Sequence, residues 1–273
     1  MKIHHKMFRK VFLLIIVIST LLACKKEEPV DNASQSTSGG STQDDGIVHN
    51  AVMDIDGHSY DAIIIGNKVW MIQNLKTTRY ANGENIPMGS KDVFSDELPY
   101  RYAPNDDNSN VLKYGYLYNW PAVMHGENSS SSDPSGVQGI CPYGWHVPSN
   151  AEWNQLVTIV GTKTEFQCDN NRNNIAKALA STSGWQECSK NCAVGNNQSM
   201  NNLTHFCVYP TGYGGEAVNS NFGRDAYFWS STISYILGQE RLVSDFELDY
   251  YSALTYTYSL RKRNALAVRC VRD

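Results

Sequence analysis

Three acidic residues near the C-terminus occupy every second position of one predicted strand. They are Asp245, Glu247 and Asp249. This spacing puts their carboxylates on one face of the strand, about 7 Å from one to the next. Retaining glycosidases need two carboxyl groups about 5 to 5.5 Å apart with unlike pKa values, whereas neighbours on an open strand face stay ionised. We therefore interpret the three as a solvated sheet face, with binding of a cation or a sugar hydroxyl as the alternative.

Four tyrosines follow these acids closely in the sequence. They are Tyr250, Tyr251, Tyr256 and Tyr258. Flat, amphipathic tyrosine rings of this kind stack on sugars or anchor contacts with other proteins. Packing between neighbouring strands is the competing interpretation. The three acids and four tyrosines together are the candidate ligand-binding residues.

A polar loop near the middle of the chain contains the weaker metal candidates. Asp106 and Asp107, flanked by Asn105 and Asn108, offer the hard oxygen ligands that calcium takes. A polar turn explains the same residues, and apart from this calcium hypothesis we expect no cofactor. The common motifs of hydrolases, zinc proteases and nucleotide sites are absent, so the sequence predicts no catalytic residue and no enzyme. We interpret His146 as a buried, hydrogen-bonded histidine, with a catalytic base as the alternative.

Six cysteines remain when Cys24 is set aside from the seven in the chain. They are Cys141, Cys168, Cys188, Cys192, Cys207 and Cys270. An even set in an exported chain predicts disulfides, three in this case, but the sequence does not choose among the possible pairings. Zinc ligation is disfavoured because no CxxC pair is present.

Residues 1–23 have the composition of a secretory signal peptide. The segment from Met1 to Lys10 is basic, and the following apolar run ends at Leu22. This run is too short to cross a hydrocarbon core of about 30 Å. Ala23 directly before Cys24 resembles a bacterial lipobox, in which the cysteine is acylated and becomes the new N-terminus. Cys24 is the predicted lipidation site, and more than one acyl chain would hold the protein stably on a membrane.

Residues 24–50 form the predicted linker. The charged segment Lys25-Lys26-Glu27-Glu28 resembles an export tag of surface lipoproteins. The following residues are mostly small and polar and include no aromatic side chain up to Gly46, so they cannot bury enough apolar area to form a core. The sequence therefore predicts a lipid-anchored protein of the outer membrane that is exposed at the cell surface.

The composition of the whole chain is that of a globular protein. Hydrophobic residues make up 41% and charged residues 18%, which excludes a disordered chain or a protein with many membrane spans. Lys and Arg total 23 against 27 for Asp and Glu. An acidic balance argues against a nucleic-acid groove, which needs clustered basic residues to displace counterions from phosphates.

Turn and capping signals predict the elements that position these residues. The segments 53–60 and 63–70 are each typical of two short strands around a turn, Asp-Gly in the first and Gly-Asn in the second. Ser149 and Glu152 form a capping box that predicts a helix starting at residue 150 or 151. Further elements are a second helix around 174–181 and strands over 227–231, 241–249, 254–260 and 265–271. This order predicts an α+β domain.

Six sequence blocks resemble the Fibrobacter succinogenes major paralogous domain over residues 51–273. The blocks are Asp54-Ile-Asp-Gly-His-Ser-Tyr60, Ile65-Gly-Asn-Lys-Val-Trp-Met-Ile-Gln-Asn-Leu75, Tyr114-Gly-Tyr-Leu-Tyr-Asn-Trp120, Gly139-Ile-Cys-Pro-Tyr-Gly-Trp-His-Val-Pro-Ser149, Phe228-Trp-Ser-Ser-Thr232 and Val268-Arg-Cys-Val271. The resemblance implies an exported lipoprotein with a C-type lectin-like fold of two helices and a curled antiparallel sheet. It implies no reaction.

The resemblance also implies that Cys141 and Cys270 form a disulfide that closes the domain. For the other four cysteines, position suggests Cys168 with Cys192 and Cys188 with Cys207. Calcium-dependent lectins of the related fold usually carry Trp-Asn-Asp on a strand, and Trp229-Ser-Ser stands where that tripeptide would be expected. The familiar calcium geometry of those lectins is therefore not supported.

These observations favour a non-catalytic, surface-exposed binding module for a glycan or a protein ligand. One alternative is a structural or assembly component of the cell envelope. The other is an enzyme of the related formylglycine-generating fold, which would need at least one free thiol besides Cys24.

Overall fold

The computed structural model describes residues 46–90, 92–214, 221–236 and 239–273. The predicted signal peptide, the lipidation site Cys24 and nearly all of the linker lie outside the described residues, and their assignment stays a prediction. Among the described residues, no helix combines the length and apolar character needed to cross a membrane.

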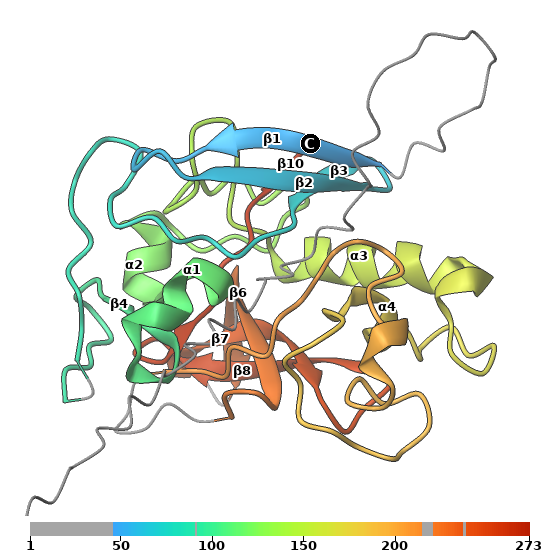
Figure 1. Cartoon of the computed structure of the whole chain (residues 1–273). Helices are drawn as coiled ribbons and strands as arrows, with labels where there is room; N and C mark the ends of the chain where they lie inside the picture. Colours follow the sequence, from blue (N-terminus) through green and yellow to red (C-terminus); the bar gives the residue numbers. More distant parts are fainter. Residues whose placement is uncertain (1–45, 91, 215–220, 237–238) are drawn as a thin grey trace, which may run out of the picture.

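The described residues form a four-stranded sheet and two three-stranded sheets, all with antiparallel pairing. The first has the order β1 (Ile47–Met53), β2 (Ser59–Ile65), β3 (Lys68–Met71), β10 (Val271–Arg272). The second has the order β4 (Arg101–Tyr102), β5 (Leu117–Asn119), β9 (Ala265–Leu266), and the third β6 (Asp225–Ile236), β7 (Gln239–Asp249), β8 (Thr255–Arg261). The four-stranded sheet and the β6–β7–β8 sheet lie on opposite sides of the domain (Figure 1).

Helices are short apart from one. The α-helices are α1 (Val111–Tyr114), α2 (Trp120–Met124), α3 (Asn150–Thr162) and α4 (Ala176–Leu179). The 3-10 helices are η1 (Pro104–Asp106), η2 (Asn108–Asn110), η3 (Thr164–Phe166) and η4 (Gln198–Met200). The capping box at the start of α3 is confirmed, since Ser149 and Glu152 bond each other's backbone N–H. The helix predicted around 174–181 is shorter than expected, because Ala180 is extended and bridges to Val208.

The α+β class is confirmed, with the sheets dominating, but the strands do not form one continuous curled sheet. The predicted strand 265–271 is split between two sheets, because its ends pair with β5 and β3 respectively. Between them, Ala267 bridges to Phe228 of β6, so this segment touches all three sheets. Both predicted hairpins in the first sheet are confirmed.

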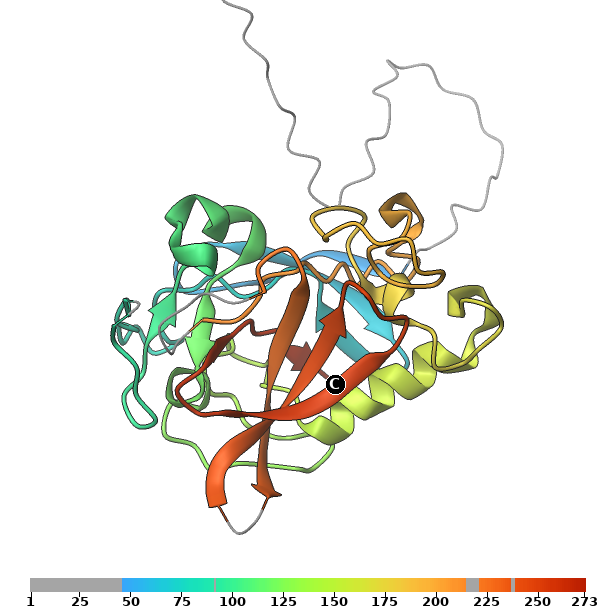
Figure 2. The same ribbon diagram turned by 90° about the horizontal axis from the view of Figure 1, so that it is seen from below.

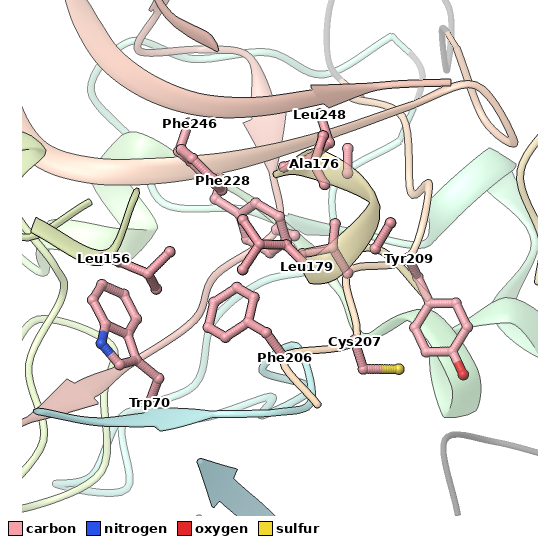
Figure 3. Packing of buried hydrophobic residues seen from close by; sticks show 14 of the residues in the cluster. Trp70, Leu156, Ala176, Leu179, Phe206, Cys207, Tyr209, Phe228, Phe246 and Leu248 are labelled. Carbon is pink, nitrogen blue, oxygen red and sulfur yellow. The ribbon is translucent and has the colours of Figure 1, made fainter. Parts of the chain in front are cut away.

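The larger hydrophobic cluster packs around Trp153 of α3. Its ring stacks on Phe246 with 4.5 Å between centroids and lies 4.7 Å from Trp70. Phe206 meets the rings of both tryptophans edge-on. Figure 3 shows Trp70, Phe206 and Phe246 converging from separate segments. The capped helix therefore delivers its apolar side to the centre of the domain, as its spacing predicts.

Side-chain hydrogen bonds connect the segment of β6 that begins with Trp229 to other parts of the domain. The Trp229 indole N–H donates to the Tyr118 carbonyl. The Ser230 hydroxyl donates to the Ser244 carbonyl, and the Ser231 hydroxyl to the Ser130 carbonyl. All three of these β6 residues are 0% exposed. The Trp229-Ser-Ser segment therefore serves the core of the domain.

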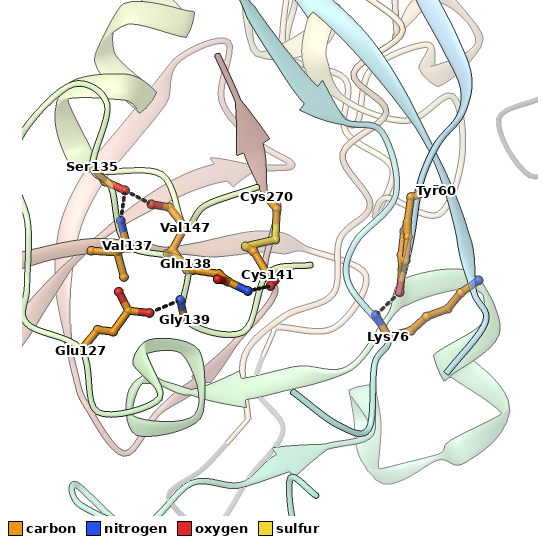
Figure 4. Close-up of a disulfide and its surroundings, with 10 residues drawn as sticks. All are labelled: Tyr60, Lys76, Glu127, Ser135, Val137, Gln138, Gly139, Cys141, Val147 and Cys270. Carbon is orange, nitrogen blue, oxygen red and sulfur yellow. Dashed lines mark hydrogen bonds between the residues drawn. A yellow bond between two sulfur atoms is a disulfide. The ribbon is translucent and has the colours of Figure 1, made fainter. Parts of the chain in front are cut away.

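Two disulfides brace the described domain. Cys141 is bonded to Cys270, with a sequence separation of 129, and this bond ties the segment before α3 to the residue before β10 (Figure 4). Cys168 is bonded to Cys192, with a separation of 24. The two predicted pairings are confirmed.

The third predicted pairing, Cys188 with Cys207, is wrong. Cys188 has a free thiol, whose Sγ accepts a hydrogen bond from the Lys190 backbone N–H at 3.2 Å. Cys207 is 1% exposed and lies in the core cluster, whereas Cys188 is half-buried in the loop that the Cys168–Cys192 bond closes. The Cys188 sulfur thus contacts its own loop and forms no disulfide with Cys207.

A buried arginine near the C-terminus organises the centre of the domain. Arg269 is 0% exposed, and burial lowers the pKa of its guanidinium to about 9. Its N–H groups donate to the Asn74 side-chain oxygen and to the carbonyls of Met71, Phe206 and Cys207. The guanidinium also lies 4.8 Å from the Phe206 ring and 5.5 Å from the Phe228 ring. Carbonyl oxygens and ring faces thus compensate this charge.

Candidate functional site

The β6–β7–β8 sheet presents a set of acidic and aromatic side chains on one of its faces. Across β6 and β7 the paired positions are Asp225 with Asp249, Tyr227 with Glu247, and Trp229 with Asp245. Across β7 and β8 they are Glu247 with Tyr256 and Asp245 with Tyr258. Directly paired residues project to the same side of a sheet. We call this side, with Asp225, Asp245, Glu247, Asp249, Tyr256 and Tyr258, the carboxyl face.

Strand alternation explains why the acids gather there. The residues between them, Phe246 and Leu248, point into the core cluster together with Phe228 of β6. The twisted three-stranded sheet carrying both faces lies toward the viewer in Figure 2. The hydrophobic residues thus fix the register, and the register fixes the carboxyl face.

Asp245 is the exceptional residue of the carboxyl face. It is 1% exposed, and neither of its carboxylate oxygens has a hydrogen-bond partner. Burial raises the pKa of this carboxyl to about 7, although nearby backbone N–H groups act in the opposite direction. The expectation of a solvated, fully ionised sheet face is therefore wrong for Asp245.

Two neighbouring carboxyls are perturbed in the same direction. Burial and the negative charges of Asp245, Asp225 and Asp249 raise the pKa of Glu247 to about 8. Burial and the charge of Asp249 raise the pKa of Asp225 to about 6, even though Asp225 accepts a hydrogen bond from the Tyr227 hydroxyl at 3.1 Å. The carboxyl face thus brings several partly buried carboxyl groups close together, and each disfavours ionisation of the others.

The four candidate tyrosines separate into two pairs. Tyr256 and Tyr258 belong to the carboxyl face, where their rings are parallel within 15° and 5.6 Å apart, and Tyr258 is 56% exposed. Tyr250 and Tyr251 instead lie in the turn after β7. There they pack under Arg224 and Lys190, whose charged groups are 5.1 and 4.9 Å from their ring centres. The turn pair is therefore outside the candidate site.

Sequence reasoning missed Asp225 and Tyr227. Both lie on β6, and their proximity to Glu247 depends on the pairing of β6 with β7. The strand itself was predicted from residue 227, but the register between two strands is not visible in either strand alone. One indication of their shared position is visible in the sequence. Asp225, Tyr227 and Trp229 alternate along the strand, so their side chains lie on the same side of it.

A model of the Fibrobacter succinogenes major domain family matches residues 63–272. The chain belongs to this family. The matched region contains the whole carboxyl face, α3 and the Cys141–Cys270 and Cys168–Cys192 disulfides. No curated protein and no solved structure matches the chain.

The weak metal candidates of this Fibrobacter succinogenes major domain behave as polar turn residues. Asp107 accepts a hydrogen bond from the Ser109 backbone N–H at 2.8 Å and so caps η2, which lowers the pKa of its carboxyl. Asp106 is exposed and has a positive φ of 53°. Neither belongs to a group of three acidic, histidine or cysteine ligands among the described residues.

A second cluster, Asp54, Asp56 and His58, brings possible ligand atoms within 4.8 Å of one another. Both carboxylates are already occupied by the protein. Asp54 accepts hydrogen bonds from the Tyr60 hydroxyl and from the backbone N–H groups of Asp56 and His58. Asp56 accepts from Thr78 and Arg79, which, against the effect of burial, lower the pKa of its carboxyl to about 2. This part of the family domain is a folded turn with its oxygens satisfied.

The third cluster surrounds Lys68, which is 1% exposed. Its ammonium lies 2.8 Å from Asp133 and 3.0 Å from Glu152, and it also contacts Asp273. Burial opposes the charge, but the three carboxylates raise the pKa of Lys68. His146 bonds the same Glu152 oxygen at 2.7 Å, which confirms that it is a buried, hydrogen-bonded histidine. The Lys68 ammonium already occupies the space between these carboxylates, so this cluster has no room for a metal ion.

The unpartnered carboxyl of Asp245 predicts how the stability of the domain depends on pH. Its raised pKa means that the folded state holds the proton more tightly than the unfolded state, so Asp245 costs stability as the pH rises from about 4 through about 7. We expect Asp245→Asn to be more stable than wild type at pH 8, on the order of 1–3 kcal/mol, with the difference vanishing near pH 4. Urea denaturation at both pH values measures this.

The exposed Glu165 provides the control, because Glu165→Gln changes an acid of similar size outside the carboxyl face. We expect that variant to match wild type at both pH values. A loss of stability in Asp245→Asn at pH 8 would show that the Asp245 carboxylate is stabilised by contacts and would refute this account.

Proposed function

We propose that this protein is a non-catalytic binding module of the bacterial cell surface, tethered by a lipid on Cys24, with a C-type lectin-like domain. Its ligand is a glycan or a protein, and the carboxyl face is the contact surface. The observation that carries the proposal is Asp245, a 1% exposed acid with both oxygens unpartnered. Such a group destabilises the fold, so its presence is best explained by a gain in function.

The lectin-like part of the proposal rests on how the two ends of the domain meet. The last strand, β10, pairs with β3 in the same sheet that holds β1 and β2. The Cys141–Cys270 bond fastens this closure. Long irregular connections between the sheets, such as residues 125–149, resemble the loop-rich side of lectin-like domains.

The placement of the tether favours the carboxyl face as the outward surface. The predicted linker joins the domain at β1, in the four-stranded sheet, and the β6–β7–β8 sheet lies on the other side (Figure 1). A domain held at β1 therefore has the sheet that carries the carboxyl face on the side opposite its attachment. This orientation suits capture of a ligand from outside the cell.

A glycan array and a pull-down from cell-surface extract test the proposal with the same protein variants. We expect Tyr258→Ala to reduce ligand capture at least about tenfold, because an exposed ring beside buried acids is the accessible part of the carboxyl face. Tyr143→Ala is the matched control, since Tyr143 is also well exposed, at 70%, but lies outside the β6–β7–β8 sheet. Equal capture by both variants would contradict the proposed surface.

The two alternatives predict different results in these assays. An assembly component of the envelope gives a clean glycan array and one stoichiometric protein partner whose capture ignores Tyr258→Ala. An enzyme of the formylglycine-generating type needs a reactive thiol, and Cys188 is a free thiol. Substrate turnover that is lost in Cys188→Ser would favour that enzyme over a binding module.

A further inference from the structure

We infer that the carboxyl face recognises the primary ammonium group of a lysine side chain on a protein partner. This inference rests on the proposed function and narrows its ligand from a glycan or a protein to a lysine-bearing protein segment. Three features of the described residues support it: uncompensated negative charge, aromatic rings beside that charge, and a spacing of oxygens that suits several N–H donors.

The negative charge of the carboxyl face has no cation paired with it. None of its four acids forms a salt bridge with a Lys, Arg or His among the described residues. The charged and titratable groups that face Glu247 are Asp225 and Tyr227 on β6, Asp245 and Asp249 on β7, and Tyr256 and Tyr258 on β8. Arg224 weakly favours the Asp225 carboxylate, but its guanidinium is held over the Tyr250 ring at 5.1 Å. A bound cation would compensate the negative charge that these described residues leave unpaired.

The aromatic rings add a second attraction for a cation. Tyr256 and Tyr258 stand on the strand next to Glu247 and Asp245, and their π faces carry partial negative charge. Tyr258 is 56% exposed, so a ligand can reach this pair from solvent. A long, flexible alkyl stem with a terminal charge fits such a surface because the stem lies along the rings while the charge reaches the acids.

The arrangement of oxygens disfavours a metal ion. In the described residues, no three ligand atoms of the carboxyl face come within 4.8 Å of one another. Calcium needs six to eight oxygens at about 2.3–2.6 Å, so the face is too open to hold it as it stands. An ammonium group instead carries three N–H donors that point in different directions and can reach separate carboxylates.

The same groups favour lysine over an amino sugar or a neutral sugar. Burial raises the pKa of Asp245 to about 7, and burial with the neighbouring carboxylates raises the pKa of Glu247 to about 8, so the ligand must keep its charge at and above neutral pH. A lysine ammonium, with a pKa of about 10.4, meets that condition. A neutral hydroxyl can accept from a protonated carboxyl or donate to an ionised one, but it brings no positive charge to compensate the acids.

Calorimetry with the full-length protein tests the inference. The probes are pentalysine, pentalysine acetylated on every Nε, and an N-acetylated chitin pentamer. We expect pentalysine alone to bind, to bind more tightly at pH 8 than at pH 6, and to release protons, which titration in two buffers of different ionisation enthalpy detects. Equal or tighter binding of either neutral probe, or tighter binding of pentalysine at pH 6, would overturn the inference.

Variants separate this site from general attraction to an acidic protein. Glu247→Gln is expected to weaken pentalysine binding about tenfold or more, and the exposed Glu165→Gln should leave it unchanged. Tyr258→Leu, which keeps an apolar side chain but loses the π face, gives an independent reading if Glu247→Gln fails to fold. Equal weakening by the Glu165 variant would refute the assignment. If Tyr258→Ala abolishes capture of a cell-surface ligand but pentalysine does not bind, the proposed function stands and the lysine inference fails.

Discussion

Lys68→Met is expected to lower the free energy of unfolding by about 3–5 kcal/mol at pH 7. The substitution removes the ammonium that contacts Asp133, Glu152 and Asp273, and Glu152 is 0% exposed. Glu152 keeps its hydrogen bonds from His146 and from backbone N–H groups but loses the ammonium that offsets the cost of its burial. Guanidinium denaturation of wild type and variant measures the loss, with the exposed Lys163→Met as the matched control, expected within about 0.5 kcal/mol of wild type.

The pH dependence of this loss identifies its cause. Although burial favours the protonated acid, bonds from His146, Ser149 and Lys68 lower the pKa of Glu152 below its ordinary 4.5. A lowered folded-state pKa gives stability that is present above pH 4.5 and is lost as the pH falls through the folded value. The gap between wild type and Lys68→Met should therefore narrow below pH 4.5. A gap that stays constant to pH 3 would assign the loss to packing instead of charge.

Removing the Cys141–Cys270 disulfide is the second change with a large expected effect. Its sequence separation of 129 corresponds, in the chain-entropy model, to about 4–5 kcal/mol of stability. Both sulfurs are 0% exposed, so alanine is the appropriate replacement, and we expect Cys141→Ala with Cys270→Ala to unfold at a much lower urea concentration than wild type.

The second disulfide provides the comparison. Cys168 and Cys192 are only 24 positions apart, which corresponds to about 1–1.5 kcal/mol less stabilisation in the same model. The double alanine variant at these positions should therefore be the more stable of the two. The opposite order would mean that the long loop is already constrained in the unfolded chain.

The elements that sequence predicted best depend on local chemistry. The α3 helix starts where its capping box places it, because Ser149 and Glu152 bond backbone groups within the same turn. The first two hairpins follow from their Gly-containing turns in the same way. The two confirmed disulfides are different, since one came from the family resemblance and the other from a guess about position.

The features that sequence did not predict depend on contacts between distant segments. The environment of Asp245 comes from the pairing of β7 with both β6 and β8, which removes water from a position that looks solvent-facing in a single strand. The division of the last predicted strand arises because residues 265–272 meet three different partners. The free thiol of Cys188 follows from the path of its loop, which spacing does not reveal.

The buried guanidinium near the C-terminus constrains when the core can form. Arg269 bonds Asn74 and Met71, which precede it by 195 and 198 positions, and also the carbonyls of Phe206 and Cys207. Until synthesis reaches this residue, those carbonyls have no donor and the space between Phe206 and Phe228 has no occupant. The native core is therefore complete only once segments from both ends of this span have packed around Arg269.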